Sequence, residues 1–255
     1  MSQTGLPVLS VSNLKKKYKS VEAVKGVSFD VAEGEIFGII GENGCGKTTT
    51  IESLLGIRIP EEGNISMLGI NPLHCSSIDR KTLFNMVGVQ FQETHYQDKI
   101  KVKEVCEIAS SLYRKPINWN QLLSDFGLDT KKDSYVAQLS GGQKQRLAIV
   151  LALIPDPRLV FLDELTTGLD PKARRKIWEY LKTLQKKGLT IVLTSHYMDE
   201  IEYLCSRIAV MKSGRITAIG TPKELIEKHG TKNLEETFLQ YMDEPSDEEG
   251  EEDDE

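Results

Sequence analysis

Ile36-Phe-Gly-Ile-Ile-Gly-Glu-Asn-Gly-Cys-Gly-Lys-Thr48 is the stretch of this 255-residue chain that decides its fold. The apolar run Ile36–Ile40 predicts a strand buried on both faces, and Thr48–Leu55 predicts a helix after it. Between them, Gly41–Thr48 has the spacing G-x-x-x-x-G-K-[ST] that is typical of a phosphate-binding loop. Because strand, loop and helix follow in that order, a merely flexible glycine-rich turn is the poorer interpretation.

The chemistry of a phosphate loop explains these residue types. Glycines let successive backbone N–H groups face an anion, and the helix N-terminus adds positive dipole character. Lys47 is expected to reach the β- and γ-phosphates, and the Thr48 hydroxyl to bind Mg²⁺. We expect a lowered thiol pKa for Cys45, since it lies at a helix N-terminus near Lys47. The predicted nucleotide ligands here are Gly41, Glu42, Asn43, Gly44, Cys45, Gly46, Lys47, Thr48 and Thr49.

Two carboxylates follow another apolar run, Leu159–Leu162. Adjacent acids at a buried strand end are costly unless a cation or a donor uses them. Beside a phosphate loop, Asp163 is expected to hold Mg²⁺, directly or through water. Glu164 is then expected to polarise the attacking water as general base. The alternative is an acid pair that serves only a helix N-terminus.

Short apolar runs alternate with helical patterns along the chain, which predicts an α/β fold with a mainly parallel sheet. The remaining runs are Met86–Phe91, Thr190–Thr194 and Arg207–Met211. A helix is expected over Pro171–Lys186. The beginning of the chain differs, because Val27–Val31 alternates with period two and Ile65–Met67 lies between glycines, which indicates antiparallel strands.

The middle and the end of the chain are mostly helical in pattern. No convincing strand occurs between Glu93 and Ser134, so we predict a helical insertion over about 93–155. Thr221-Pro-Lys-Glu224 has capping-box spacing with proline at the first helical position, and Gly230 can end that helix. We expect one domain over 1–230, a short helix over 231–242, and an acidic disordered tail over 243–255.

The most diagnostic motif is Leu139-Ser-Gly-Gly-Gln143. Ser140 and Gln143 have capping-box spacing, and the two glycines leave backbone N–H groups uncovered at the start of a helix that runs to Ile154. A capped buried helix without a ligand is the alternative. With this motif the sequence resembles the ATP-binding cassette (ABC) ATPases, whose signature is LSGGQ, over roughly Val8 to Gly220. The resemblance implies a RecA-like P-loop core with an antiparallel N-terminal β-subdomain and a helical insertion that carries the signature.

The resemblance also assigns roles by position. Tyr18 looks like the aromatic residue that stacks on adenine, and His196 like the histidine that contacts the γ-phosphate. Gln92 looks like the glutamine that senses Mg²⁺ and water, and it is preferred over the nearby Gln90. The signature residues would cap the γ-phosphate held by a second subunit; they are Ser140, Gly141, Gly142 and Gln143.

Further motifs concern the contact between two cassettes and the geometry of the site. Gly168-Leu-Asp170 looks like the loop that crosses the dimer. Leu165 departs from the family, which usually has proline there, and this puts the stiffness of the link to that loop in doubt.

Four motifs each follow a separate apolar run directly: the phosphate loop, Gln92, the acid pair and Ser195–His196. Since ligands of open α/β sheets bind at the carboxyl ends of the strands, we expect these motifs to meet at one edge.

Composition excludes several classes of protein. The net charge is −6, but ten acidic residues lie in 243–255, and the remainder carries 32 basic against 28 acidic residues. That balance is too weak to indicate nucleic-acid binding. The longest strongly apolar run, Leu147–Ile154, is far short of the roughly 20 residues that cross a bilayer, so no membrane insertion is expected. The four scattered cysteines form no zinc motif and indicate a reducing compartment.

The sequence around His196, Ser-His-Tyr-Met-Asp-Glu200, resembles that of the branch of the family that exports drugs and polysaccharides. This implies an ATP- and Mg²⁺-dependent hydrolase that works as a homodimer or with a paired cassette. It would power export through a separate integral membrane permease, on the cytoplasmic face of the membrane. The alternative is a soluble cassette that acts as an assembly or regulatory factor. A P-loop kinase or GTPase leaves Leu139–Gln143 unexplained. The acidic tail is either solubilising or a competitor of phosphate.

Overall fold

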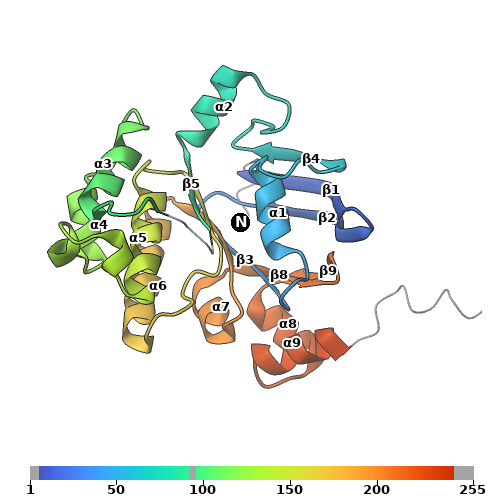
Figure 1. The fold of residues 1–255 in the computed structure, drawn as a ribbon. Coiled ribbons are helices and arrows are strands. Elements are labelled where there is room, and N and C mark those ends of the chain that lie inside the picture. Colours follow the sequence, from blue (N-terminus) through green and yellow to red (C-terminus); the bar gives the residue numbers. More distant parts are fainter. Residues whose placement is uncertain (1–5, 92–95, 244–255) are drawn as a thin grey trace, which may run out of the picture.

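Two β-sheets organise the part of the chain that the computed structural model describes, residues 6–91 and 96–243 (Figure 1). The larger sheet has the order β5–β6–β7–β3–β8–β9 and is parallel except for β9. The smaller sheet, β2–β1–β4, is antiparallel. The strands are β1 (Leu9–Tyr18), β2 (Val21–Val31), β3 (Ile36–Gly41), β4 (Glu62–Met67), β5 (Val87–Gln90), β6 (Leu159–Leu162), β7 (Thr190–Thr194), β8 (Arg207–Lys212) and β9 (Arg215–Gly220). The predicted fold class is confirmed.

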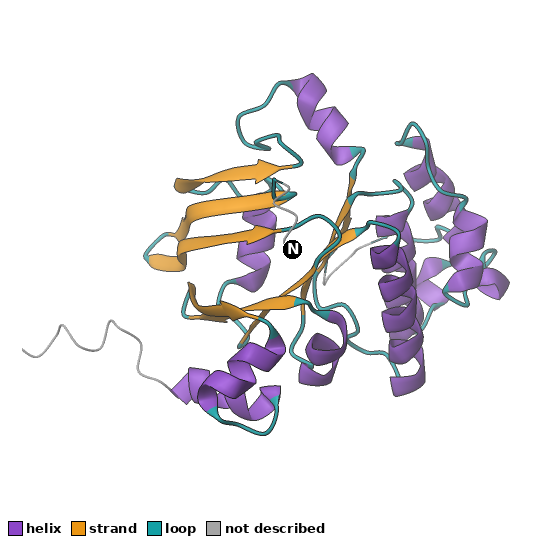
Figure 2. Cartoon of the chain, turned by 180° about the vertical axis from the view of Figure 1, so that it is seen from behind, coloured by secondary structure: helices purple, strands orange, loops and turns teal. Residues whose placement is uncertain are grey.

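Helices cover both faces of the larger sheet. In the described ranges they are α1 (Lys47–Leu54), α2 (Ser77–Phe84), α3 (Val102–Ser111), α4 (Trp119–Asp125), α5 (Gly141–Leu153), α6 (Pro171–Lys186), α7 (Met198–Leu204), α8 (Pro222–His229) and α9 (Leu234–Asp243). Figures 1 and 2 place α3 to α6 at one end of the molecule and the antiparallel sheet at the other. No helix among the described residues is long and apolar enough to span a membrane.

The central strand β3 shows how the sheet divides the core. Ile36 and Ile40 belong to a hydrophobic cluster with the helices of the insertion, α6 and α7. Phe37 and Ile39 point to the opposite face and pack in a second cluster with α1 and the antiparallel sheet. This period-two alternation of wholly apolar residues is what burial on both faces requires. The loop after β3 is therefore held from both sides.

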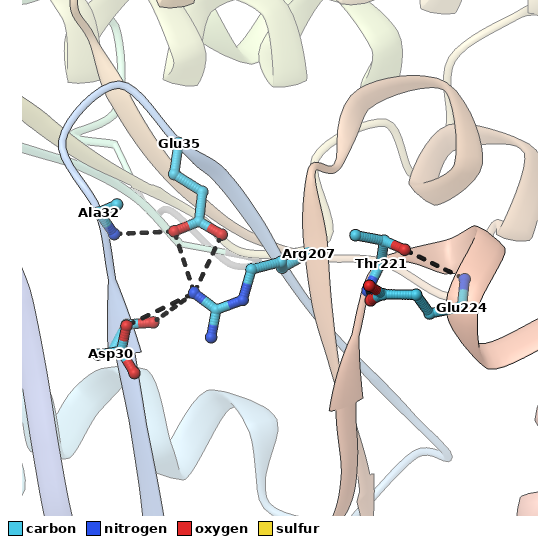
Figure 3. Close-up of polar contacts among 6 residues, drawn as sticks. All are labelled: Asp30, Ala32, Glu35, Arg207, Thr221 and Glu224. Atoms are coloured by element: carbon cyan, nitrogen blue, oxygen red, sulfur yellow. Dashed lines mark hydrogen bonds and ion pairs between the residues drawn. The ribbon is translucent and has the colours of Figure 1, made fainter. Parts of the chain in front are cut away.

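Arg207, at the start of β8, ties the antiparallel sheet to the larger one (Figure 3). Its guanidinium donates to both carboxylate oxygens of Glu35 at 3.4 Å and to the backbone oxygen of Asp30 at 3.4 Å. Glu35 in turn accepts a hydrogen bond from the Ala32 N–H at 2.8 Å. The buried Glu35 carboxylate is thus paired, as a buried charge must be. This bridge fixes the end of β2 against β3 and β8.

The C-terminal helices agree closely with the sequence-based prediction. Thr221 and Glu224 form the predicted capping box (Figure 3). Gly230 ends α8 in the left-handed conformation. The expected short helix is α9, which reaches Asp243, so assigning Asp243 to the disordered tail was wrong. The rest of the predicted tail, 244–255, lies outside the described residues. The domain limit at 230 stays a prediction.

Candidate functional site

Four neighbouring parallel strands, β3, β7, β6 and β5, end at the same edge of the larger sheet. The phosphate loop follows β3, Ser195–His196 follows β7, and Asp163–Glu164 follows β6. The predicted convergence of these three motifs is confirmed. Gln92, which follows β5 by two residues, lies outside the described residues.

A cavity of about 840 Å³ opens at this edge. Its lining contains most of the predicted loop together with Glu164 and His196. It also contains three residues that the sequence analysis missed: Ala23 on β2, Met198 at the start of α7, and Phe238 on α9. The loop residues that line it are Gly41, Glu42, Asn43, Gly44, Gly46, Lys47, Thr48 and Thr49. A volume of this size accommodates a nucleotide.

The N-terminus of α1 forms the floor of the cavity. Gly46 caps the helix at φ 109°, and a Cβ there would lie 2.4 Å from the Ala23 carbonyl oxygen, so only glycine fits. No side chain among the described residues caps this helix end, which leaves its first N–H groups for an anion. Lys47 Nζ donates to the carbonyl oxygens of Gly41 at 2.8 Å and Glu42 at 2.9 Å. The ammonium group is thereby held at the mouth of the loop.

Asp163 is buried beside the loop. Its Oδ2 accepts a hydrogen bond from the Thr48 hydroxyl at 2.9 Å, and its Oδ1 accepts one from the Thr194 hydroxyl at 2.5 Å. Burial raises the pKa of Asp163, and these two hydroxyl bonds act in the opposite direction. A hydroxyl and a carboxylate are the hard oxygen donors that Mg²⁺ prefers, and Mg²⁺ usually adds waters and phosphates to one or two such ligands. The residues therefore fit the ion, although no cluster of three or more His, Cys, Asp or Glu occurs in the described ranges.

Glu164 lines the cavity with a strained backbone. Its φ is 51°, a left-handed conformation that costs about 1–3 kcal/mol in a residue other than glycine. The Glu164 N–H donates to Thr194 Oγ1 at 2.8 Å, and Gln145 Nε2 donates to the Glu164 carbonyl oxygen at 3.1 Å. Thr167 Oγ1 donates to the carboxylate at 3.2 Å. Neighbouring elements thus hold the side chain towards the cavity at the cost of strain.

His196 and Gln90 differ in their exposure and in their relation to the cavity. His196 is exposed and lines the cavity. Gln90, the alternative to Gln92, is buried, and its Nε2 donates to the carbonyl oxygens of Asp163 at 2.9 Å and Phe91 at 2.8 Å. Gln90 therefore holds the main chain of Asp163, just after β6, from the neighbouring strand β5. The role expected of Gln92 stays a prediction.

The exposure and the pKa of the Cys45 thiol differ from the prediction. The side chain is buried beside the Gly41 backbone and is absent from the cavity lining. Burial raises the pKa of the thiol and outweighs the lowering effect of Lys47, so the predicted lowering was wrong. A thiol at a helix N-terminus has a lowered pKa only where it is partly exposed, and the Cys45 thiol is not.

Tyr18 and the signature motif do not line the cavity. The ring of Tyr18 lies 5.4 Å from Lys16 Nζ and 6.0 Å from the Arg58 guanidinium. Ser140 and Gln143 make the predicted capping box at the start of α5, and Ser140 and Gly141 are exposed. The tip of α5 is thus open to solvent, as its expected role towards a second subunit requires.

Packing explains how Leu165 can stand where the family usually has proline. The side chain is fully buried in the cluster that contains α5 and α6. Its carbonyl oxygen accepts a hydrogen bond from Gln145 Nε2 at 2.8 Å. The segment after Glu164 is therefore held by a leucine anchor and by a side chain of the signature helix, without the stiffness of proline.

Comparisons with known proteins agree with this geometry. The model of the ABC transporter family matches residues 24–167. The chain is 41% identical over 226 residues to the Nod factor export ATP-binding protein I of Rhizobium sp. (strain N33), which covers 87% of this chain and 73% of that protein. The protein of the same name from Ralstonia nicotianae is 40% identical, over 86% of this chain and 69% of its own length.

Solved structures show the same architecture. An ATP-binding subunit of an ABC transporter superposes with a TM-score of 0.82 at 28% identity, over 91% of this chain and 98% of that one. A dimeric bacterial ABC transporter cassette superposes with a TM-score of 0.77 at 27% identity, over 84% of this chain and 98% of that one.

Proposed function

We propose, from the premise that this chain belongs to the ABC transporter family, that it powers export through a separate membrane permease by closing on ATP with a second cassette. ATP binding and hydrolysis are activities of that family. One observation carries the proposal: a cavity lined by the phosphate loop, Glu164 and His196 lies on the same chain as an exposed signature tip that does not line it. The names of the Rhizobium and Ralstonia relatives support export as the direction.

Each cavity residue has a task in this proposal. The N–H groups at the start of α1 and the Lys47 ammonium hold the β- and γ-phosphates, and Lys47 exchanges its carbonyl partners for phosphate oxygens. Thr48 and Asp163 hold Mg²⁺, which neutralises charge on the β- and γ-phosphates when bound. Glu164 orients and deprotonates the attacking water, and His196 contacts the γ-phosphate. Tyr18 stacks on the adenine.

The second cassette completes the site. Ser140 and Gly141 present the open N-terminus of α5 to solvent, where its N–H groups can meet the γ-phosphate held by another subunit. The existence of a similar cassette in dimeric form supports this arrangement. The partner is a second copy of this chain or a paired cassette. Binding of ATP then joins the two subunits, and hydrolysis removes the phosphate that joins them.

A second cavity, of about 390 Å³, supports docking to a permease. It lies on the helical insertion, and its lining is Gln97, Asp98, Lys99, Ile100, Glu104, Glu107 and Ile108. Three carboxylates against one lysine favour a cytoplasmic segment of the permease that carries basic residues. Such docking would hold the chain at the cytoplasmic face of the membrane.

The test is to purify the tagged chain from its own cells in mild detergent with ATP. We expect an integral membrane protein to co-purify in stoichiometric amount, with ATPase activity that Lys47→Ala abolishes. A Glu107→Lys variant should lose the membrane protein and keep ATP binding. A chain that hydrolyses ATP but brings down no membrane protein would instead support the assembly or regulatory alternative.

A further inference from the structure

A fully buried carboxylate lies on α7, the helix whose first residue, Met198, lines the cavity, and it has no task in the proposed mechanism. Glu200, on α7, is 0% exposed, and its Oε1 accepts a hydrogen bond from the Trp178 indole N–H of α6 at 2.7 Å. Its Oε2 is also buried and makes no hydrogen bond within the described residues. A half-satisfied buried carboxylate is costly, so a purely structural role would be served better by an apolar side chain.

The surroundings of Glu200 are the two turns that carry catalytic candidates. The hydroxyls of Ser195 and Thr166 lie close enough to oppose the effect of burial, which raises the pKa of Glu200. Ser195 immediately precedes His196, and Thr166 follows Glu164 by two residues. The Thr166 hydroxyl is itself buried without a hydrogen bond in the described structure. One carboxylate therefore faces the backs of both turns.

Helix α6 makes a second contact with the His196 turn. The Arg174 guanidinium lies 3.9 Å from the centre of the Tyr197 ring, and its Nη1 lies 3.7 Å from Asp199 Oδ2. Tyr197 and Asp199 flank the first residue of α7. Since α6 starts at its cap Asp170, in the loop expected to cross the dimer, these contacts link that loop to the turn of His196.

We propose that Glu200 is a positioning residue, which with Trp178 holds the His196 turn at a fixed place relative to the turn of Glu164. The role rests on the proposed ATPase function of the cavity. The carboxylate bridges α6 and α7 through the indole, and it lies near the hydroxyls of the two turns. Its displacement would move His196 away from the γ-phosphate without touching the phosphate loop.

Glu200→Gln tests the role, because the amide keeps the shape and an acceptor for the indole but changes what faces Ser195 and Thr166. We expect kcat to fall by about 10- to 100-fold with little change in KM for ATP, since a displacement of about 1 Å can cost on the order of 10²-fold. The matched control is Glu179→Gln, an exposed glutamate next to Trp178, which should leave kcat unchanged.

A double-mutant cycle separates positioning from general stability. If Glu200 acts through His196, Glu200→Gln in a His196→Ala background should cost less than about twofold, because the two changes remove the same interaction. An equal fold loss in both backgrounds, or a kcat equal to that of Glu179→Gln, would overturn the proposal.

A separate readout keeps the positioning role apart from the ATPase function. With nitrogen-15-labelled histidine, the His196 imidazole signals, assigned with His196→Ala, should shift in Glu200→Gln and stay in place in Glu179→Gln. Absence of Lys47-dependent turnover in the wild type would defeat the proposed function alone. Unmoved His196 signals would defeat the positioning role alone.

Discussion

Thr194→Val isolates the hydroxyl that holds the two acids after β6 together. The Thr194 hydroxyl donates to Asp163 Oδ1 at 2.5 Å and accepts from the Glu164 N–H at 2.8 Å, and the residue is fully buried. Valine has nearly the same shape and suits a strand, so packing is kept while both bonds are lost. The substitution therefore measures the polar contacts and little else.

The expected loss follows from those two bonds. A hydrogen bond to a charged group contributes about 1.5–3 kcal/mol, and a buried unsatisfied N–H costs about 1–3 kcal/mol. Because Glu164 is only partly buried, we take the lower part of each range and expect the free energy of unfolding to fall by about 3 kcal/mol. We also expect kcat to fall, since the N–H bond helps to hold Glu164 in its strained conformation.

Thr190→Val is the matched control on the same strand. Thr190 is also fully buried, but it is the first residue of β7 and does not line the cavity. In the described structure its hydroxyl makes one neutral hydrogen bond, which it accepts from the Gly34 N–H at 2.9 Å. Its loss should cost about 1 kcal/mol and leave kcat unchanged. Denaturant unfolding of the wild type and both variants, with single-turnover ATPase measurements, makes the comparison.

The pH dependence gives a second check on Thr194→Val. The Thr194 bond lowers the pKa of Asp163, whose folded-state pKa is nevertheless raised by burial. For a carboxyl with a raised folded pKa, folding favours the protonated form, and stability is lost as pH rises through the window between the unfolded and folded pKa. Removing the bond raises the folded pKa further, so the deficit of the variant should shrink as the pH falls from the folded pKa of the variant through that of the wild type. A deficit no larger than that of Thr190→Val, or equal at all pH values, refutes the reasoning.

Three other predictions concern turnover and binding. Glu164→Gln should lower kcat by about 10²–10⁴-fold and leave ATP-bound dimers intact on size-exclusion chromatography; near-wild-type turnover would reject Glu164 as the base. Phe238→Ala opens the α9 wall of the cavity and should weaken ATP binding by about 3- to 10-fold, roughly 1 kcal/mol of lost apolar contact, whereas the exposed neighbour Leu239→Ala should not. Deletion of 244–255 removes nine acidic residues and should leave ATPase activity unchanged at both low and high salt; activation only at low salt would indicate competition with phosphate.

The sequence predicted the parts of the fold that local patterns determine. Leu159–Leu162, Thr190–Thr194 and the helix Pro171–Lys186 have the predicted bounds, because uniform apolarity or a strong helical period marks them along their whole length. The convergence of three motifs at one edge was predictable because parallel strands share the direction of their carboxyl ends. β9 was missed, since its exposed, alternating residues are fixed by pairing with β8 and not by a local pattern.

The site was less predictable where it depends on packing between distant segments. Phe238 lines the cavity because both ends of α9 are docked: Glu202 accepts from the Leu234 N–H, and Lys212 donates to the carbonyl oxygens of Tyr241 and Met242. Nothing in the spacing around Phe238 indicates that contact.

Cys45 and Asp163 show why burial decides the chemistry of a motif. Both were assigned ionised or reactive roles from their neighbours in the sequence, and burial raises the pKa of both. For Asp163 the Thr48 and Thr194 hydroxyls stabilise the ionised form, and a bound cation would further offset the cost of burying its charge. For Cys45 no such partner outweighs burial, and the thiol behaves as a small apolar side chain that supports the turn of the loop. Burial thus acts on a proposed metal ligand in one case and on a side chain of the core in the other.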